Sequence, residues 1–226
     1  MKNKTLMSSG LVAALAAALP ATIAAAGTTV QSDEASFVAA AGGAGLAFAY
    51  GEDFESYAIS GGYNMLPSPW TSSVAPNLSM ASGNNSNLFL ALGAYYWASI
   101  PSNAMGTLEN SGPLSLSFAG GVNAVGMDLY GTSTFIAGYF DDIAYTVFDT
   151  GGAVLASGNF AASGSTGAYF GVVTDSDLIG EIQIDGTRFG SLGSQQFADN
   201  IQAWVPAPGA LAVLGLGGAF IGRRRR

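Results

Sequence analysis

The stretch 143–157, IAYTVFDTGGAVLAS, contains two apolar segments joined by Gly151 and Gly152. Paired glycines accept the positive φ angles of tight turns between antiparallel strands, so this stretch predicts a β-hairpin. Apolar and polar residues also alternate elsewhere along the chain, which is typical of strands with one buried face. The alternating segments are 114–118, 125–130, 181–185 and 200–204.

Short apolar segments bounded by Gly, Asn or Ser predict further strands. They are 48–54, 78–81, 88–92, 95–99 and 168–173. About ten short strands in one domain of about 180 residues are typical of an antiparallel sandwich. The 32 glycines and the charged fraction of 10% also favour turn-rich β structure over helix or disorder. We therefore expect an all-β protein, an antiparallel β-sandwich of jelly-roll type.

One short helix is expected ahead of these strands, over 33–41. Ser32 can cap it, the two acids that follow suit the positive end of a helix, and Gly42 with Gly43 would end it. The residues expected on its buried side are Phe37, Val38 and Ala41.

The charges divide the chain into a body and two ends. Six of the seven basic residues lie in the first four or last four positions, whereas all fifteen acidic residues lie between Asp33 and Asp199. Within 27–204 the one basic residue is Arg188 against fifteen acids, a formal charge of −14. Such a body should repel nucleic acid and anionic lipid surfaces. It suits a divalent cation such as calcium, which prefers oxygen ligands.

Cysteine and histidine are both absent from the chain. No disulfide can form, and Ser-His-Asp catalysis, Cys-His catalysis and zinc sites with histidine or thiolate ligands are excluded. Paired carboxylates can hydrolyse glycosides, but no motif selects one pair among the fifteen acids. We therefore expect no catalytic activity and keep a glycoside-active enzyme as the third alternative.

The N-terminus has the pattern of a secretory signal peptide. Two lysines precede an apolar stretch at 11–19, and Ala24 with Ala26 forms an A-x-A-like cleavage site. We expect cleavage after Ala26, so that residues 1–26 are removed and the mature chain begins at Gly27. The alternative interpretation is a buried Ala-rich helix.

The C-terminal tail combines a small-residue motif, an apolar segment and a basic end. The motif Val205-Pro-Ala-Pro-Gly209 precedes thirteen apolar residues at 210–222 and then four arginines. Thirteen residues of helix span roughly 20 Å, whereas the hydrocarbon core is about 30 Å thick. The segment is therefore expected to be a short transmembrane helix with its arginine end in the cytoplasm. This arrangement is typical of anchors that are removed after sorting.

This tail resembles the PEP-CTERM sorting signal, which exosortase-type transpeptidases recognise. The positions that match the family pattern are Val205, Pro206, Pro208, Gly209, Arg223, Arg224, Arg225 and Arg226, and Ala207 stands where the family usually has Glu. The resemblance implies a bacterium with a complex envelope, transient anchoring in the inner membrane, and a final place on the cell surface or in a biofilm matrix.

The body also resembles domains found ahead of such tails. These domains carry an early helix, a strand with an Asp-Phe-Glu signature, and a closing strand with Asp-Asn followed by an apolar residue. Asp53-Phe54-Glu55 and Asp199-Asn200-Ile201 match these positions. The resemblance implies a jelly roll comparable to carbohydrate-binding modules.

The acids of these two signatures are the candidate calcium ligands. Glu55 is expected on an early strand and Asp199 on the last strand, and the first and last strands of jelly rolls often pair. Pairing would bring the carboxylates together, and a calcium ion would relieve their repulsion. The alternative is that both are separate, solvated surface carboxylates. No cofactor other than calcium is expected.

Aromatic residues are the candidates for binding a sugar. Trp70 lies between Pro69 and a polar segment in an expected loop, where its ring would be exposed. The segment 95–97, Tyr-Tyr-Trp, could form a second platform, although burial in the core is the commoner fate of large aromatic residues.

The sequence thus predicts three parts: a signal peptide (1–26), a β-sandwich domain (27–204) and a sorting tail (205–226). We expect a non-catalytic exported protein with a structural or adhesive role in a surface matrix. Its expected partners are signal peptidase and an exosortase-like transpeptidase during export, and later neutral polysaccharide or other copies of itself, but not nucleic acid. The alternative is a carbohydrate-binding module for the organism's own exopolysaccharide.

Overall fold

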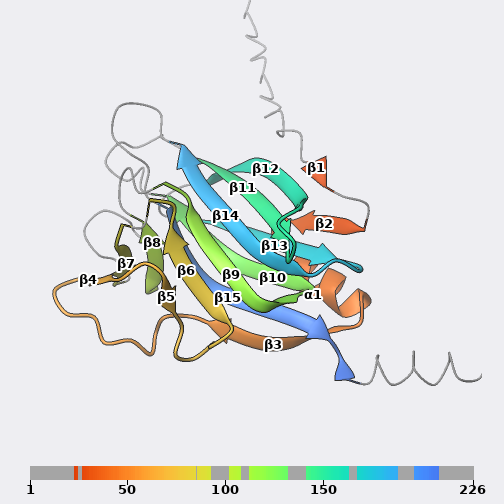
Figure 1. Cartoon of the computed structure of the whole chain (residues 1–226), viewed down its shortest axis with the longest axis horizontal. Helices are drawn as coiled ribbons and strands as arrows, with labels where there is room; N and C mark the ends of the chain where they lie inside the picture. Colours follow the sequence, from red (N-terminus) through yellow and green to blue (C-terminus); the bar gives the residue numbers. More distant parts are fainter. Residues whose placement is uncertain are drawn as a thin grey trace, which may run out of the picture.

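The computed structural model describes residues 23–24, 27–84, 86–92, 102–107, 112–131, 141–162, 167–187 and 196–208. These residues form two antiparallel sheets and one helix, α1 (Figure 1). The first sheet contains, in spatial order, β1 (Ile23–Ala24), β12 (Val154–Ala162), β11 (Asp141–Asp149), β14 (Ile179–Thr187), β9 (Leu114–Val122), β6 (Leu78–Ser82) and β5 (Trp70–Thr71). The second sheet contains β2 (Thr28–Gln31), β13 (Ala168–Thr174), β10 (Ala124–Gly131), β15 (Gln196–Pro206), β8 (Ala104–Thr107), β7 (Leu88–Ala91) and β4 (Tyr63–Leu66), and β3 (Leu46–Glu52) also pairs with β15. The expected all-β, antiparallel sandwich-like fold with one helix is confirmed.

Strands β11 and β12 form the hairpin that the glycine pair predicts. The N–H of Asp149 donates to the carbonyl of Ala153 at 2.8 Å. The Oδ1 atom of Asp149 accepts bonds from the N–H groups of Gly151 and Ala153, both at 2.8 Å. Gly152 has a φ of 86°, a left-handed conformation that favours glycine. The hairpin prediction is therefore confirmed, with Asp149 closing the turn.

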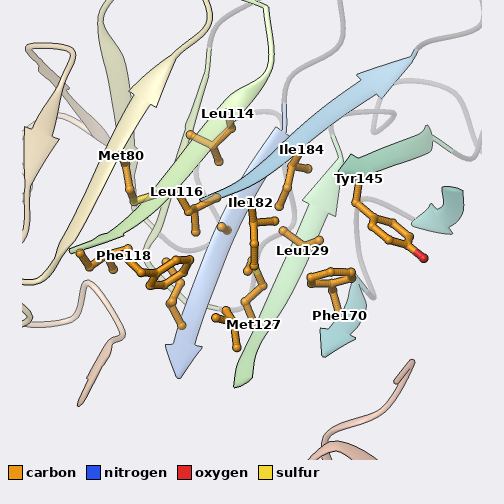
Figure 2. Close-up of a cluster of buried hydrophobic side chains, with 14 of the residues drawn as sticks. Met80, Leu114, Leu116, Phe118, Met127, Leu129, Tyr145, Phe170, Ile182 and Ile184 are labelled. Carbon is orange, nitrogen blue, oxygen red and sulfur yellow. The ribbon is translucent and has the colours of Figure 1, made fainter. Parts of the chain in front are cut away.

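The core lies between the sheets and follows the alternation in the sequence. Leu114, Leu116 and Phe118 of β9 are buried, and the serines between them are half-buried. Side chains of the second sheet, among them Met127 and Leu129 of β10, meet them from the other side (Figure 2). Full burial of a side chain of this size contributes roughly 1.5–3 kcal/mol. This core stabilises a chain that contains no disulfide.

The strands that the sequence pattern missed are short. Strand β5 has two residues, and β2, β4 and β8 have four each, too few to establish a period. The closing strand extends beyond the expected segment 200–204 at both ends. Asn200, with a φ of 49°, forms a bulge in it, so the alternation of inward-facing and outward-facing side chains before the bulge is out of step with the alternation after it. The expected strand at 95–99 lies outside the described residues.

The helix α1 (Glu34–Gly43) lies where it was expected, but two details of the prediction are wrong. Asp33, not Ser32, caps it, since Asp33 is extended and its Oδ1 accepts the N–H of Ser36 at 2.8 Å. Phe37 and Ala41 are buried, whereas Val38 is 40% exposed because it lies one residue, and about 100° of helix, beyond Phe37.

Only a few residues of the two chain ends are described. Of the expected leader these are Ile23 and Ala24, and of the sorting tail they are 205–208. Ala26, Gly209 and Arg223 to Arg226 lie outside the described residues. Among the helical residues that the structure describes, no segment has the length and apolar character to span a bilayer.

Aromatic rings lie over glycines on the outer side of the second sheet. The ring of Phe37 in α1 occupies the space above Gly126 and Gly171, so that a Cβ added at either would lie 2.7 Å from it. The ring of Phe197 covers Gly106 in the same way, on the neighbouring strand. These glycines let α1 and the aromatic rings approach the backbone closely.

We predict that Gly106→Ala destabilises the protein by roughly 1–3 kcal/mol, because the added methyl group overpacks the site. A Cβ at Gly106 would lie 2.3 Å from the carbonyl oxygen of Gln196 and 2.4 Å from the Phe197 ring. Gly42→Ala in α1 is the matched control, since a Cβ there meets nothing within 4 Å and alanine favours helix. Urea denaturation of both variants measures the effect, and equal stability of the two would contradict it.

Candidate functional site

The described residues contain many carboxylates and no basic side chain. Of the fifteen acids all but Glu109 lie in the described ranges, while all seven Lys and Arg residues lie outside them. Several of these carboxylates accept hydrogen bonds from backbone N–H groups, hydroxyls or side-chain amides: Asp33, Glu34, Glu52, Asp53, Glu55, Asp128, Asp149, Glu181 and Asp199. Any site in this part of the chain is therefore built from oxygen atoms and neutral donors.

Glu52, at the end of β3, is the centre of one such network. It is 2% exposed, and its carboxylate accepts the N–H of Phe54 at 2.9 Å and the hydroxyl of Tyr57 at 3.0 Å. The hydroxyl of Ser72 donates to the same carboxylate, and its oxygen accepts the N–H of Ala75 at 2.7 Å. Glu52 therefore ties the end of β3 to the turn between β5 and β6.

The Asp-Phe-Glu signature forms a turn directly after this strand. Phe54 has a φ of 57° and is fully buried, and Asp53 accepts the N–H of Glu55 at 3.1 Å. The expectation that Glu55 lies on an early strand is wrong, because β3 ends at Glu52. The left-handed residue Phe54 turns the chain, and the Oε1 atom of Glu55 accepts the N–H of Asn103 at 2.7 Å.

The Asp-Asn signature lies at the bulge of β15. Asp199 is fully buried, pairs with Asp128 of β10, and accepts the N–H of Asn200 at 2.7 Å. The hydroxyl of Ser102 donates to its other carboxylate oxygen. The side-chain amide of Asn200 donates to Asp128 at 2.8 Å.

The two signatures thus meet at one short segment. Glu55 binds the backbone of Asn103, and Asp199 binds the side chain of the preceding residue, Ser102. Strand β3 pairs with β15, with Glu52 opposite Ile201, so an early strand and the closing strand lie side by side as expected. Sequence reasoning missed Ser102 and Asn103, which no motif marks.

The electrostatics of this cluster favour protonation of Asp199. Burial raises the pKa of Asp199 to about 7, and the nearby charges of Asp128 and Glu55 add to this shift. The hydrogen bonds from Ser102 and Asn200 oppose it. Burial, with the charges of Asp128 and Asp199, also raises the pKa of Tyr130 to about 12.

Calcium binding by Glu55 and Asp199 stays a prediction. Within the described ranges no three acids lie together as a set that could hold a metal ion. Both carboxylates retain lone pairs beyond the bonds that they accept, so they could contribute ligands to an ion completed by water or by other oxygen atoms.

Trp70 is placed differently from the expectation. It begins β5 instead of lying in a loop, and it is half-buried. Its ring packs against Phe54 at a centroid distance of 6.0 Å and against Tyr57 at 5.6 Å. Trp70 therefore belongs to the aromatic cluster beside the Glu52 network. The residues 95–97 lie outside the described residues.

A more exposed aromatic pair lies at the edge of the second sheet. Tyr63 of β4 is 39% exposed and stacks on Phe89 of β7 at 5.0 Å with an interplanar angle of 19°. Met65, two residues along β4, is 51% exposed. The sequence did not single out this pair because the two strands are short and lie far apart along the chain.

A pocket lies beside the β11–β12 turn. The carboxylates that line it are Asp149, which closes the turn, and Glu181, which accepts the side-chain amide of Gln183 at 2.9 Å. Phe118 and Phe148 also line it. Its residues come from three strands and a turn, so no local motif announces it.

No protein-family model matches the chain, and no curated protein matches it significantly.

We predict that Asp199→Asn changes the pH dependence of stability in metal-free buffer. The folded pKa of about 7 lies above the ordinary aspartate value of 3.8, so the stability that Asp199 contributes should be fully present below pH 4 and be lost as the pH rises through 7. The variant should lack this loss and be more stable than wild type at pH 8, by roughly 2–4 kcal/mol. Denaturation at several pH values measures it, with Asp177→Asn, an exposed acid, as control. If the free energy of unfolding depends on pH in the same way for wild type and Asp199→Asn, the raised pKa of Asp199 is refuted.

If Glu55 and Asp199 share a calcium ion, calcium should stabilise the wild type by about 2.7 kcal/mol at a hundredfold excess over the dissociation constant. A chelator should lower the melting temperature, and Asp199→Ala should abolish the calcium response. Asp177→Ala should retain it. The measurement is made at moderate ionic strength, which screens general repulsion. A melting curve that calcium and chelator leave unchanged removes both residues from the list of ligands.

Proposed function

We propose that this chain is a non-catalytic exported protein, displayed at a bacterial surface or in its extracellular matrix by an exosortase-type sorting system, with a structural or adhesive role. One observation carries the proposal. The described body has no basic side chain, while six of the seven basic residues lie in the chain's first four or last four positions. This distribution suits a body that crosses the membrane between a leader and a tail held inside by arginines.

The C-terminal geometry agrees with this proposal. Val205 and Pro206 of the sorting motif are the last residues of β15, opposite Ala47 and Leu46 of β3. The N–H of Ala207 donates to the carbonyl of Gly45 at 3.0 Å. The folded body therefore extends into the motif with no intervening linker, and the tail would hold the domain close to the membrane during sorting.

The N-terminal geometry agrees as well. Strand β2 begins at Thr28, one residue after the expected cleavage site, and the carbonyl of Gly27 accepts the N–H of Asp175 at 2.9 Å. Cleavage after Ala26 would leave β2 and the second sheet intact. It would remove β1 from the edge of the first sheet.

The domain between these ends is proposed to be a jelly roll. An antiparallel sandwich with a large apolar core and no disulfides suits a durable matrix component. Its acidity makes polyanions poor partners, because like charges repel within a Debye length of about 8 Å at physiological salt.

Carbohydrate binding is the second candidate. The observation that favours it is the exposed ring of Tyr63, stacked on the half-buried Phe89, because a flat aromatic face can pack against the apolar face of a neutral sugar. In this case the domain itself, and not the tail, would hold the protein at the surface.

We predict that the mature protein from the native host begins at Gly27 and lacks Arg223 to Arg226. Intact-mass measurement on surface-extracted protein tests this processing. Deletion of 209–226 leaves β15 whole and should release the domain into the medium, because the tail determines surface retention.

Two outcomes would contradict this prediction differently. A surface fraction that retains both chain ends overturns sorting by cleavage. A tail-deleted domain that is processed correctly and still binds the surface firmly shows that the domain is the binder, and Tyr63→Ala should then release it.

A further inference from the structure

The outer edge of β12 is covered by only two described residues, and both belong to the expected leader. In β1, Ile23 pairs with Ser157 and Ala24 with Ala156, in antiparallel register (Figure 1). The other side of β12 is paired along its length with β11. The structure therefore shows that this edge accepts an antiparallel strand.

Strand β12 differs from the other strands at the described sheet edges. Three of those strands, β2, β4 and β5, have two to four residues, and β3, which among the described residues pairs only with β15, has seven and ends in the charged Glu52, whereas β12 has nine. Natural edge strands are usually short, or protected by charged residues or proline. Strand β12, VLASGNFAA, contains no charged residue and no proline, and Val154 at its start is 53% exposed. Without β1, no other described residue pairs with this edge, which then presents a long row of N–H and carbonyl groups.

We infer that removal of the leader opens β12 and that two copies of the mature chain then pair antiparallel through this strand, which joins their first sheets. The inference rests on the proposed leader cleavage and specifies one partner of the proposed matrix protein. A second copy presents the same uncharged nine-residue edge, so the pairing is self-complementary and closes by a two-fold axis.

The charges of the two copies permit this contact. Strand β12 itself carries no acid, and the strand paired with it, β11, carries Asp141, Asp142 and Asp149. In a β12–β12 pair the two β11 strands are three strand spacings apart, roughly 14 Å, which exceeds the Debye length of about 8 Å at physiological salt. The contact therefore avoids most of the repulsion that a −14 body creates on other faces.

The core at this end also benefits from a second copy. Phe160 of β12 is half-buried and stacks on Tyr145 at 5.9 Å and Phe170 at 6.1 Å. Full overlap of two β12 strands, centred on Gly158, would place Phe160 opposite Ala156 of the second copy. The second copy would then cover the side of the Phe160 ring that faces away from β11.

The test uses protein extracted from the native surface, with its mass measured to establish leader removal. Sedimentation over a concentration series should show a dimer for the wild type. Ser157→Lys with Asn159→Lys places two charges on the outward side of β12 and should weaken the dimer by at least about tenfold, because like charges then oppose each other across the contact. The control, Ser115→Lys with Ser117→Lys, adds the same charges to the outward side of the central strand β9 and should leave the dimer unchanged.

Salt provides a second readout that does not depend on a variant. Raising the ionic strength should strengthen the wild-type dimer, because it screens repulsion between two acidic bodies, whereas a dimer bridged by cations would weaken. A processed wild type that is monomeric at about 0.5 M salt, or a β12 variant that dimerises as the wild type does, overturns the inference. Protein that retains its leader on the surface overturns the proposed function first, and the mass distinguishes that result.

Discussion

Carboxylates that have no basic side chain near them among the described residues are the constraint on which much of this structure depends. A carboxylate that cannot pair with Lys or Arg must find N–H or O–H donors, and the nearest donors are those of its own turn. Asp33 starts α1 in this way, and Asp149 closes the β11–β12 hairpin. Asp53 accepts the N–H of Glu55 within the turn after β3. Within the residues that the structure describes, these acids fix local backbone geometry through hydrogen bonds and form no ion pairs.

Two other acids, Glu52 and Asp199, are buried, and they lie on neighbouring strands of the sandwich. Glu52 and Asp199 belong to the paired strands β3 and β15, and each accepts bonds from a backbone N–H and a hydroxyl. Burying a charge costs free energy unless donors compensate it. Glu52 has three donors and Asp199 has two. Burial, with the nearby charges of Asp128 and Glu55, raises the pKa of Asp199 to about 7. Asp199 should therefore change its charge close to neutral pH.

The sequence predicted the longer elements well because their periodicity extends over enough residues. Strands β9, β10 and β14 and the β11–β12 hairpin follow alternation that is visible in the chain. The short strands could not be predicted, since pairing partners and not local pattern define them. Ser32 was misassigned because the extended residue that caps the helix is Asp33, one position later, and Val38 because it lies about 100° of helix beyond the buried Phe37.

For the candidate site, the sequence predicted that Glu55 and Asp199 would approach each other, but not how. Ser102 and Asn103, which join them, precede the short strand β8 and match no pattern. Trp70 was expected in a loop because prolines precede it, yet it begins β5 and packs against the rings of Phe54 and Tyr57. Contacts between residues so distant in sequence depend on the assembled sheets.

The scarcity of basic side chains in the body also bears on its durability. Trypsin-like proteases cut after Lys or Arg, and the sequence offers neither between Lys4 and Arg188. Most of the domain therefore contains no bond that such enzymes can hydrolyse, whether the chain is folded or transiently open. Amine-directed cross-linking is equally limited, since the lysines lie only at positions 2 and 4. Whatever digests this protein outside a cell must use a different specificity, for instance cleavage beside its many aromatic and small apolar residues.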